Sequence, residues 1–202
     1  MYQVPKLIPS HHLDRHGKLE KVFSDEEIER ITFFERILKL DDAMIGDGAV
    51  VEETRITKTG WIPIDQNTQF LYDKLAHIVG TINYDHFLYD IEWMENIQFT
   101  VYNGSEEGGG HYNWHRDSGL NGYAPYERKI SGIIMLTDSD EYEGGELLVD
   151  VMGGNQDNAL SVELNKGDLF FFDSSCHHIV KPVTKGTRKT LVFWVRGKNQ
   201  LG

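Results

Sequence analysis

The sequence has little cysteine, few basic residues and no long hydrophobic run, and each shortage excludes a class of protein. Cys176 is the single cysteine, so no disulfide can form within the chain, which favours a reducing compartment, most simply the cytoplasm. Against 32 acidic residues stand 20 lysines and arginines, and the net charge of −12 disfavours general nucleic-acid binding. No segment is apolar enough to span a bilayer, and the opening MYQVPKLIPSHHLD has no apolar leader pattern, so no membrane association is expected.

Hydrophobic residues make up 40% of the chain, which is enough for the core of one domain. Two segments in the N-terminal part carry helix signals. Over residues 23–40, Ser24 followed by Glu27 predicts a capping box. Over residues 67–83, apolar residues recur every three or four positions on one helix face. We expect both helices to pack through these faces against the rest of the molecule.

The character of the chain changes after about Tyr89. Seven short β-rich runs follow, bounded by turn residues and spaced near ten residues apart, which is typical of a double-sheet jelly roll. No internal repeat or linker divides the chain. We therefore expect one α+β domain over residues 1–202, with a helical support region at 1–90 and a catalytic double-stranded β-helix (jelly-roll) core at 91–202, the helices packed on one face.

The stretch NWHRDSG, residues 113–119, contains His-Arg-Asp, which is typical of the protein-kinase catalytic loop. That loop also needs an asparagine five residues after the aspartate, and position 122 is a glycine. No Gly-rich loop with a V-A-I-K strand precedes it and no D-F-G follows, and the chain is too short for two kinase lobes. A kinase is therefore excluded.

A metal site explains the same residues better. In a strand, residues i and i+2 point to the same side, so His115 and Asp117 can meet one ion while Arg116 points away. The adjacent His177 and His178 offer a third ligand from a later β-rich run. Two histidines and one carboxylate leave positions open on the ion, as in the facial triad of non-haem Fe(II) oxygenases.

A zinc site remains an alternative. Cys176 has the same strand parity as His178, so these two residues and His115 form a softer ligand set that would leave Asp117 idle.

A pair of polar residues follows the second histidine cluster. Arg188 lies ten residues after His178, and Thr190 lies two residues further on the same strand face. A guanidinium beside a hydroxyl is suited to bind a carboxylate, such as the distal carboxylate of 2-oxoglutarate. A surface ion pair is the alternative role for Arg188.

Four segments between residues 98 and 197 carry a resemblance to a known family. They read QFTVY, HYNWHRD, KISGIIMLTDSDEYEGGELLVD and KGDLFFFDSSCHHIVKPVTKGTRKTLVFWVRG. In this order they resemble the 2-oxoglutarate/Fe(II)-dependent dioxygenases of the prolyl 4-hydroxylase type, and most closely the PKHD-type hydroxylases. The resemblance implies Fe(II), 2-oxoglutarate and O2, with ascorbate as a further candidate cofactor.

The resemblance also implies roles for individual residues. The iron ligands are His115, Asp117 and His178, because the family register H-x-V-x-P-V begins at position 178, and His177 is then expected to face outward. The distal carboxylate of 2-oxoglutarate is expected to meet Arg188, supported by Thr190 and Tyr102.

Other pocket positions follow from the same resemblance. Tyr112 is expected to line the pocket, while Trp194 and the Gly-Gly turn of YEGGELLVD are expected to be structural. The segment NGSEEGGGH, residues 103–111, is longer than the usual family turn and suggests a mobile, acidic flap. Arg55 and Trp61 are candidate substrate contacts, with a structural role for each left open.

The implied reaction is hydroxylation of a C–H bond with release of succinate and CO2, with a peptidyl proline as the favoured target. A free amino acid, another small molecule or a nucleobase is an alternative substrate, although the net charge disfavours nucleic acid. A non-catalytic metal- or ligand-binding jelly roll is the alternative from another class. The sequence carries no signal for oligomeric state.

Overall fold

The computed structural model describes residues 14–43, 54–119, 123–154 and 156–198. The expectation of no leader falls on residues 1–13, outside the described residues. Among the described residues, no helix is long and apolar enough to cross a membrane.

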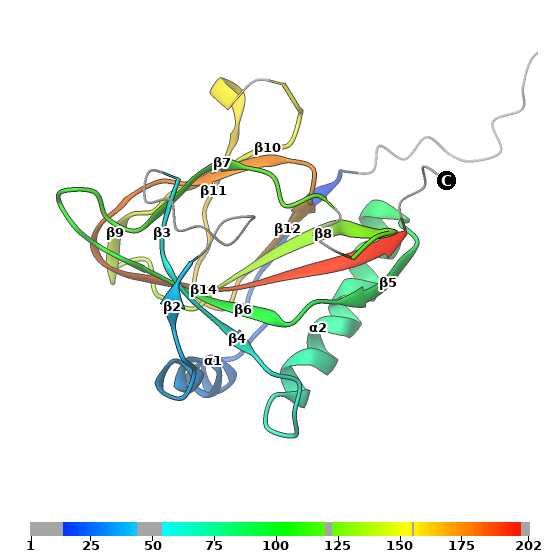
Figure 1. Ribbon diagram of the computed structural model, residues 1–202, viewed down its shortest axis with the longest axis horizontal. Coiled ribbons are helices and arrows are strands. Elements are labelled where there is room, and N and C mark those ends of the chain that lie inside the picture. Colours follow the sequence, from blue (N-terminus) through cyan, green and yellow to red (C-terminus); the bar gives the residue numbers. More distant parts are fainter. Residues whose placement is uncertain (1–13, 44–53, 120–122, 155, 199–202) are drawn as a thin grey trace, which may run out of the picture.

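Two antiparallel β-sheets form the jelly-roll core, as the spacing of β-rich runs predicted (Figure 1). The larger sheet has the order β1 (His16–Leu19), β12 (Leu169–Asp173), β8 (Tyr126–Met135), β14 (Val183–Lys198), β6 (Ile97–Asn103), β4 (Lys58–Ile62) and β2 (Asp41–Asp42), and β5 (Ile91–Met94) and β9 (Tyr142–Gly144) also pair with β14. The smaller sheet has the order β11 (Leu160–Val162), β10 (Leu147–Asp150), β13 (His177–Val180), β7 (His111–His115) and β3 (Arg55–Ile56).

The larger sheet is buried on both faces, and its sequence shows this. In β12 the run Leu-Phe-Phe-Phe-Asp is buried throughout. Phe171 packs into the cluster shared with the helices, whereas Phe170 and Phe172 pack into the cluster between the two sheets. Because side chains alternate across a strand, a continuous apolar run is what a doubly covered strand requires.

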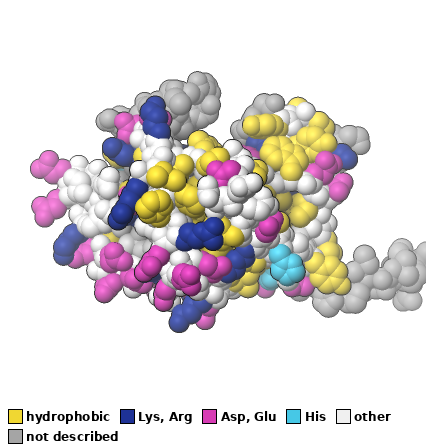
Figure 2. Space-filling model, turned by 90° about the horizontal axis from the view of Figure 1, so that it is seen from below, with side chains coloured by type: hydrophobic (Ala, Val, Ile, Leu, Met, Phe, Trp, Pro, Cys, Tyr) yellow, Lys and Arg dark blue, Asp and Glu magenta, His cyan; other side chains and the backbone are white. Residues whose placement is uncertain are grey.

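Two α-helices cover the outer face of the larger sheet (Figure 1). Helix α1 (Asp25–Thr32) begins at the expected Ser24–Glu27 capping box but ends earlier than expected, because residues 33–36 continue as a 3-10 turn, η1 (Phe33–Arg36). Helix α2 (Gln69–Ile82) passes into a π turn, η2 (Asn83–Phe87), while a third short helix, η3 (Gln156–Asn158), follows β10. Seen from the helix side, hydrophobic side chains lie exposed among charged ones (Figure 2).

The N-terminal region is more than a helical support. Strands β1 to β4 all lie before residue 63 and extend both sheets, which corrects the expectation of a purely helical segment over 1–90. These strands have two to five residues, so their side chains show no run long enough to reveal alternation. Pairing with longer strands, such as β4 with β6, holds them in place.

Candidate metal centre

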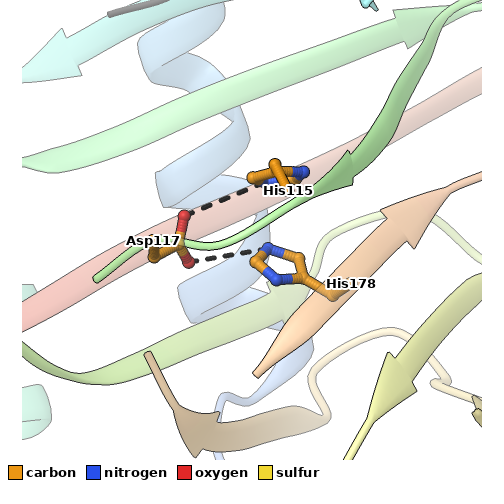
Figure 3. A group of neighbouring side chains, drawn as sticks. All are labelled: His115, Asp117 and His178. Carbon is orange, nitrogen blue, oxygen red and sulfur yellow. Dashed lines mark ion pairs between the residues drawn. The ribbon is translucent and has the colours of Figure 1, made fainter. Parts of the chain in front are cut away.

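Three predicted ligands meet in one place between the sheets (Figure 3). His115 ends β7, and His178 lies opposite it on the neighbouring β13. Asp117 follows two residues after β7 and places its carboxylate oxygens 3.8 Å from Nε2 of His115 and 3.5 Å from Nε2 of His178. The ligand atoms of the three residues all lie within 4.8 Å of one another, so one metal ion can bind all three.

Asp117 is held by the turn after β12, and not by a strand as expected. The backbone N–H groups of Asp117 and Ser118 both donate to the carbonyl of Ser174, at 3.1 and 2.8 Å. The hydroxyl of Ser131 donates to Oδ2 of Asp117 at 2.8 Å, and it also lies 2.8 Å from the hydroxyl of Ser174. These outer contacts fix the carboxylate that faces the metal. Ser131 was missed, although a serine in the apolar run KISGIIM was a signal for it.

Both histidines present Nε2 to the site. Nδ1 of His115 lies 2.7 Å from the carbonyl of Asn113, and Nδ1 of His178 lies 3.1 Å from the carbonyl of Cys176. A ring nitrogen bonded to a carbonyl carries the proton, which leaves Nε2 as the free lone pair. Burial, and then the nearby His178, lower the pKa of His115 to about 3, so this imidazole is neutral and able to bind a metal at neutral pH.

The carboxylate of Asp117 is ready to bind a cation. Burial would raise its pKa, but the imidazoles of His178 and His115 hold the pKa below its ordinary value.

The described residues do not support the zinc alternative. Among them, the group able to hold a metal consists of His115, Asp117 and His178, and it contains neither Cys176 nor His177. Burial raises the pKa of the Cys176 thiol to about 12, so the thiolate that zinc requires is disfavoured.

A cavity of about 480 Å³ opens onto the three ligands. Four residues expected at the site or as substrate contacts line it: Tyr102, Tyr112, Arg55 and Trp61. The ring of Tyr112 is stacked on the ring of His115, with centroids 3.4 Å apart and planes 16° apart. Burial raises the pKa of Tyr112, so its hydroxyl stays protonated at neutral pH.

Arg188 and Thr190 do not line this cavity and lie buried beside it. Each is 1% exposed, and neither Arg188 Nε nor Thr190 Oγ1 has a hydrogen-bond partner in the described chain. The guanidinium carbon of Arg188 lies 5.2 Å from the ring centre of Tyr102, which does line the cavity. A buried arginine without an acidic partner is costly, so this arrangement fits a carboxylate brought by a ligand.

The Gly-Gly turn before β10 supports Arg188. Gly144 and Gly145 have φ angles of +76° and +70°, which favour glycine. A Cβ at Gly145 would lie 2.9 Å from Cδ of Arg188, so the missing side chain leaves room for the guanidinium stem. The turn is structural, as expected, but what it supports is the proposed carboxylate-binding residue.

Three residues near the cavity add to what was expected. Trp194 is buried in β14, as expected, and it also lines the cavity, where the guanidinium of Arg128 stacks on it at 3.8 Å. Arg128 was missed, and it also pairs with both carboxylate oxygens of Glu95 at 2.7 Å. Arg116 was expected to point away from the site; it is exposed but also lines the cavity.

The expected flap is hydrogen-bonded to the start of β14. Gly104 donates to the carbonyl of Gly186 at 2.8 Å, and Val183 donates to the carbonyl of Gly110 at 2.9 Å. A Cβ at Gly109 would lie 1.7 Å from the carbonyl oxygen of Val183, which explains the glycine at this position by close backbone approach. None of the residues 104–110 lines the cavity.

Curated relatives match less than half of the chain. A PKHD-type hydroxylase of Stenotrophomonas maltophilia is 40% identical over 92 residues, and one of Gloeothece citriformis is 39% identical over 85 residues. These matches cover 44% and 42% of this chain, but only 39% and 37% of the relatives, so the chain matches about two fifths of their length.

Solved structures share the whole fold. A prolyl-4-hydroxylase from Pseudomonas putida is 20% identical with a TM-score of 0.69, covering 92% of this chain and 94% of that one. A prolyl hydroxylase from Trichoplax adhaerens, solved with a peptide of hypoxia inducible factor, is 16% identical with a TM-score of 0.73, covering 90% and 83%.

The family comparison agrees with the ligands and the fold. Residues 97–196, which include all three metal ligands and Arg188, match the model of the 2OG-Fe(II) oxygenase superfamily. The chain belongs to the 2OG-Fe(II) oxygenase superfamily.

Proposed function

We propose that the protein is a 2-oxoglutarate- and Fe(II)-dependent hydroxylase acting on a C–H bond, with a prolyl residue of a peptide as its favoured target. The observation that carries the proposal is the His115–Asp117–His178 cluster together with the buried Arg188, which has no acidic partner among the described residues. When bound, Fe(II) and 2-oxoglutarate supply the oxidation, in which O2 places one oxygen atom in the C–H bond and the other in succinate as CO2 leaves.

The chain's own residues bind and orient these groups. His115, Asp117 and His178 offer three ligand atoms from one side of an ion, which leaves its other positions open. Arg188 and Thr190 donate to the distal carboxylate of 2-oxoglutarate in a buried place where such bonds are strong.

Other residues shape the space in front of the metal. Tyr112 covers one face of His115, and Trp194 and Trp61 contribute apolar walls to the cavity. These walls exclude water from the place where the substrate C–H bond lies. A proline target is supported by the resemblance to prolyl hydroxylases, and a free amino acid remains the second candidate.

The experiment is a pair of measurements on the purified protein. Under anaerobic conditions, Fe(II) and 2-oxoglutarate together should give a weak visible charge-transfer band. In air, succinate should form, and a mixture of proline-containing peptides should gain the mass of one oxygen atom in mass spectrometry. The absence of both the band and succinate would favour a non-catalytic binding protein. Succinate without peptide oxidation would support the oxygenase but contradict the proline target.

A further inference from the structure

Arg55 is a buried cation whose hydrogen-bond partners among the described residues are all uncharged. It is 9% exposed, and its Nε and Nη2 donate to the hydroxyl of Thr57 at 2.8 Å and to the amide oxygen of Gln98 at 3.1 Å. Within the described chain no carboxylate forms an ion pair with it, whereas Arg128 and Arg196 share Glu95. A buried guanidinium without a counter-charge is unfavourable unless a ligand supplies one.

Arg55 faces the metal centre across one aromatic ring. It lies on β3, directly opposite Tyr112 on β7, and its guanidinium carbon is 4.5 Å from the centre of the Tyr112 ring. The ring of His115, a metal ligand, is stacked on the other face of the Tyr112 ring. Arg55 also lines the cavity, and its Nη1 has no hydrogen-bond partner among the described residues. A donor is therefore left for a ligand beside the metal.

The charge of the cavity opposes the charge of the whole protein. Three arginines line it, at positions 55, 116 and 128, and the acidic lining residue is the metal ligand Asp117. The chain as a whole carries a net charge of −12. Of the three lining arginines, Arg128 has Glu95 as an ion-pair partner, whereas Arg55 is buried and has no carboxylate partner among the described residues. Such a local field favours an anionic ligand.

We propose that Arg55 binds a carboxylate of the substrate and so selects substrates that are acidic close to the oxidised C–H bond. This inference rests on the proposed function, in which Arg188 already holds the distal carboxylate of 2-oxoglutarate. Two sources share the required chemistry: the α-carboxylate of a free amino acid or C-terminal residue, and an Asp or Glu side chain next to the target residue. Arg55 is thus a specificity-determining residue, and the guanidinium fork suits a carboxylate in either case.

The test compares matched probes on protein loaded with Mn(II) and 2-oxoglutarate. One pair is acetyl-Gly-Pro as free acid and as amide; a second pair is an amidated Gly-Asp-Pro-Gly and Gly-Asn-Pro-Gly. The paramagnetic ion broadens the NMR signals of a probe that binds beside it, which reports binding without turnover. We expect one acid probe to bind about tenfold more tightly than its neutral partner, and which pair responds identifies the source of the carboxylate.

The variants decide whether Arg55 is responsible. Arg55→Gln should abolish the acid preference, and Arg55→Lys should restore part of it, because lysine keeps the charge but loses the fork. The control is Arg36→Gln, which removes the same charge from the exposed η1, on the helix side of the larger sheet, and should keep the preference. If Arg55→Gln does not fold, Thr57→Val removes the acceptor that orients Nε and should weaken the preference.

Three results would overturn the proposal. The first is that no acid probe binds more tightly than its neutral partner to the wild-type protein. The second is that Arg55→Gln keeps the acid preference. The third is a tenfold loss of 2-oxoglutarate affinity in Arg55→Gln, which would assign Arg55 to the cosubstrate. Failure of the proposed function is a separate result, since it appears as a wild-type protein with no charge-transfer band and no succinate.

Discussion

At the scale of single residues, two adjacent histidines have different surroundings. His178 is 4% exposed and lies within ligand distance of Asp117, whereas His177 is half-buried and belongs to no metal-ligand group of the described residues. The family register in the sequence favoured His178 over His177. The structure agrees with that expectation, because His178 pairs with His115 on the neighbouring strand β7.

This difference gives a matched pair of variants. His178→Ala should weaken Fe(II) binding by about 100-fold or more, because it removes a metal ligand, while His177→Ala should change it little. Anaerobic calorimetry with Fe(II) measures both affinities. Equal losses in the two variants would contradict the assignment of His178 as the ligand.

Arg188 and Thr190 show what burial adds to a pattern. Their spacing indicated a carboxylate pocket, and the burial of Arg188, whose Nε has no hydrogen-bond partner among the described residues, removes the surface ion pair as an explanation. An unpaired buried guanidinium indicates a missing anion more strongly than any spacing can.

Arg188→Ala should raise the dissociation constant for 2-oxoglutarate about tenfold or more while Fe(II) binding is largely kept, because the charged fork to the carboxylate is lost. Arg188→Lys should lie between wild type and alanine. Anaerobic titration of the charge-transfer band measures both constants. Lys185→Ala is the control, since Lys185 is an exposed cation on the same strand, paired with Glu143. Unchanged 2-oxoglutarate affinity in Arg188→Ala would remove Arg188 from the pocket.

At the scale of elements, Asp168 joins the first strand to the core. Its carboxylate accepts from the backbone N–H groups of Lys21 at 2.9 Å and Asn165 at 3.0 Å, and it pairs with Lys18 of β1 at 2.9 Å. Burial would raise the pKa of Asp168, but these donors hold the pKa below its ordinary value. The ionised group therefore stabilises the fold at a pH above the ordinary carboxyl pKa, and this contribution disappears as the pH falls through the folded-state value.

Asp168→Asn should lower the free energy of unfolding by about 2 kcal/mol near neutral pH, because bonds to a buried charge are lost. The difference from wild type should shrink as the pH falls below about 4, because the carboxylate is then protonated first in the unfolded chain and, at lower pH, in the folded protein as well. Urea unfolding at pH 7 and at about pH 2.5 measures the two differences. Asp140→Asn, at an exposed position, is the control and should change the free energy of unfolding little at either pH. A difference that does not depend on pH would show that the charge is unimportant.

Elements were predictable where their signal is local. The capping box at Ser24 indicates the start of a helix, and the three consecutive phenylalanines of β12 indicate a buried strand. Both patterns consist of residues that are neighbours in the sequence. Strands β1 to β4 could not be found in this way, since their pairing partners lie far along the chain, such as β12 for β1. Asp117 was assigned to a strand for a related reason: the turn that holds it includes Ser174, which is distant in sequence.

At the scale of the whole molecule, the metal centre ties the two sheets together. His115 and His178 belong to the smaller sheet, while Ser131, which holds Asp117, belongs to the larger one. A ligand bound at the centre is therefore expected to stabilise the entire fold.

Fe(II) with 2-oxoglutarate, each at about 100 times its dissociation constant, should raise the melting temperature by roughly 10–20 °C, because each ligand that binds only the folded state adds about 2.7 kcal/mol. Thermal unfolding under anaerobic conditions measures the shift. Chelation of the metal should abolish the effect of 2-oxoglutarate as well, since the cosubstrate binds to the metal. A shift from 2-oxoglutarate alone, equal to that of the pair, would contradict the proposed arrangement.

The sequence by itself determined the chemistry of this protein. The H-x-D pattern, the later histidines and Arg188 are donor types that only certain ligands satisfy, and the alternation of β-rich runs required two covered sheets. The tertiary structure alone decided how these donors are used. How Asp117 is held by Ser174 and how Arg55 is bonded to Gln98 depend on contacts between residues far apart in the chain, and only folding brings such residues together.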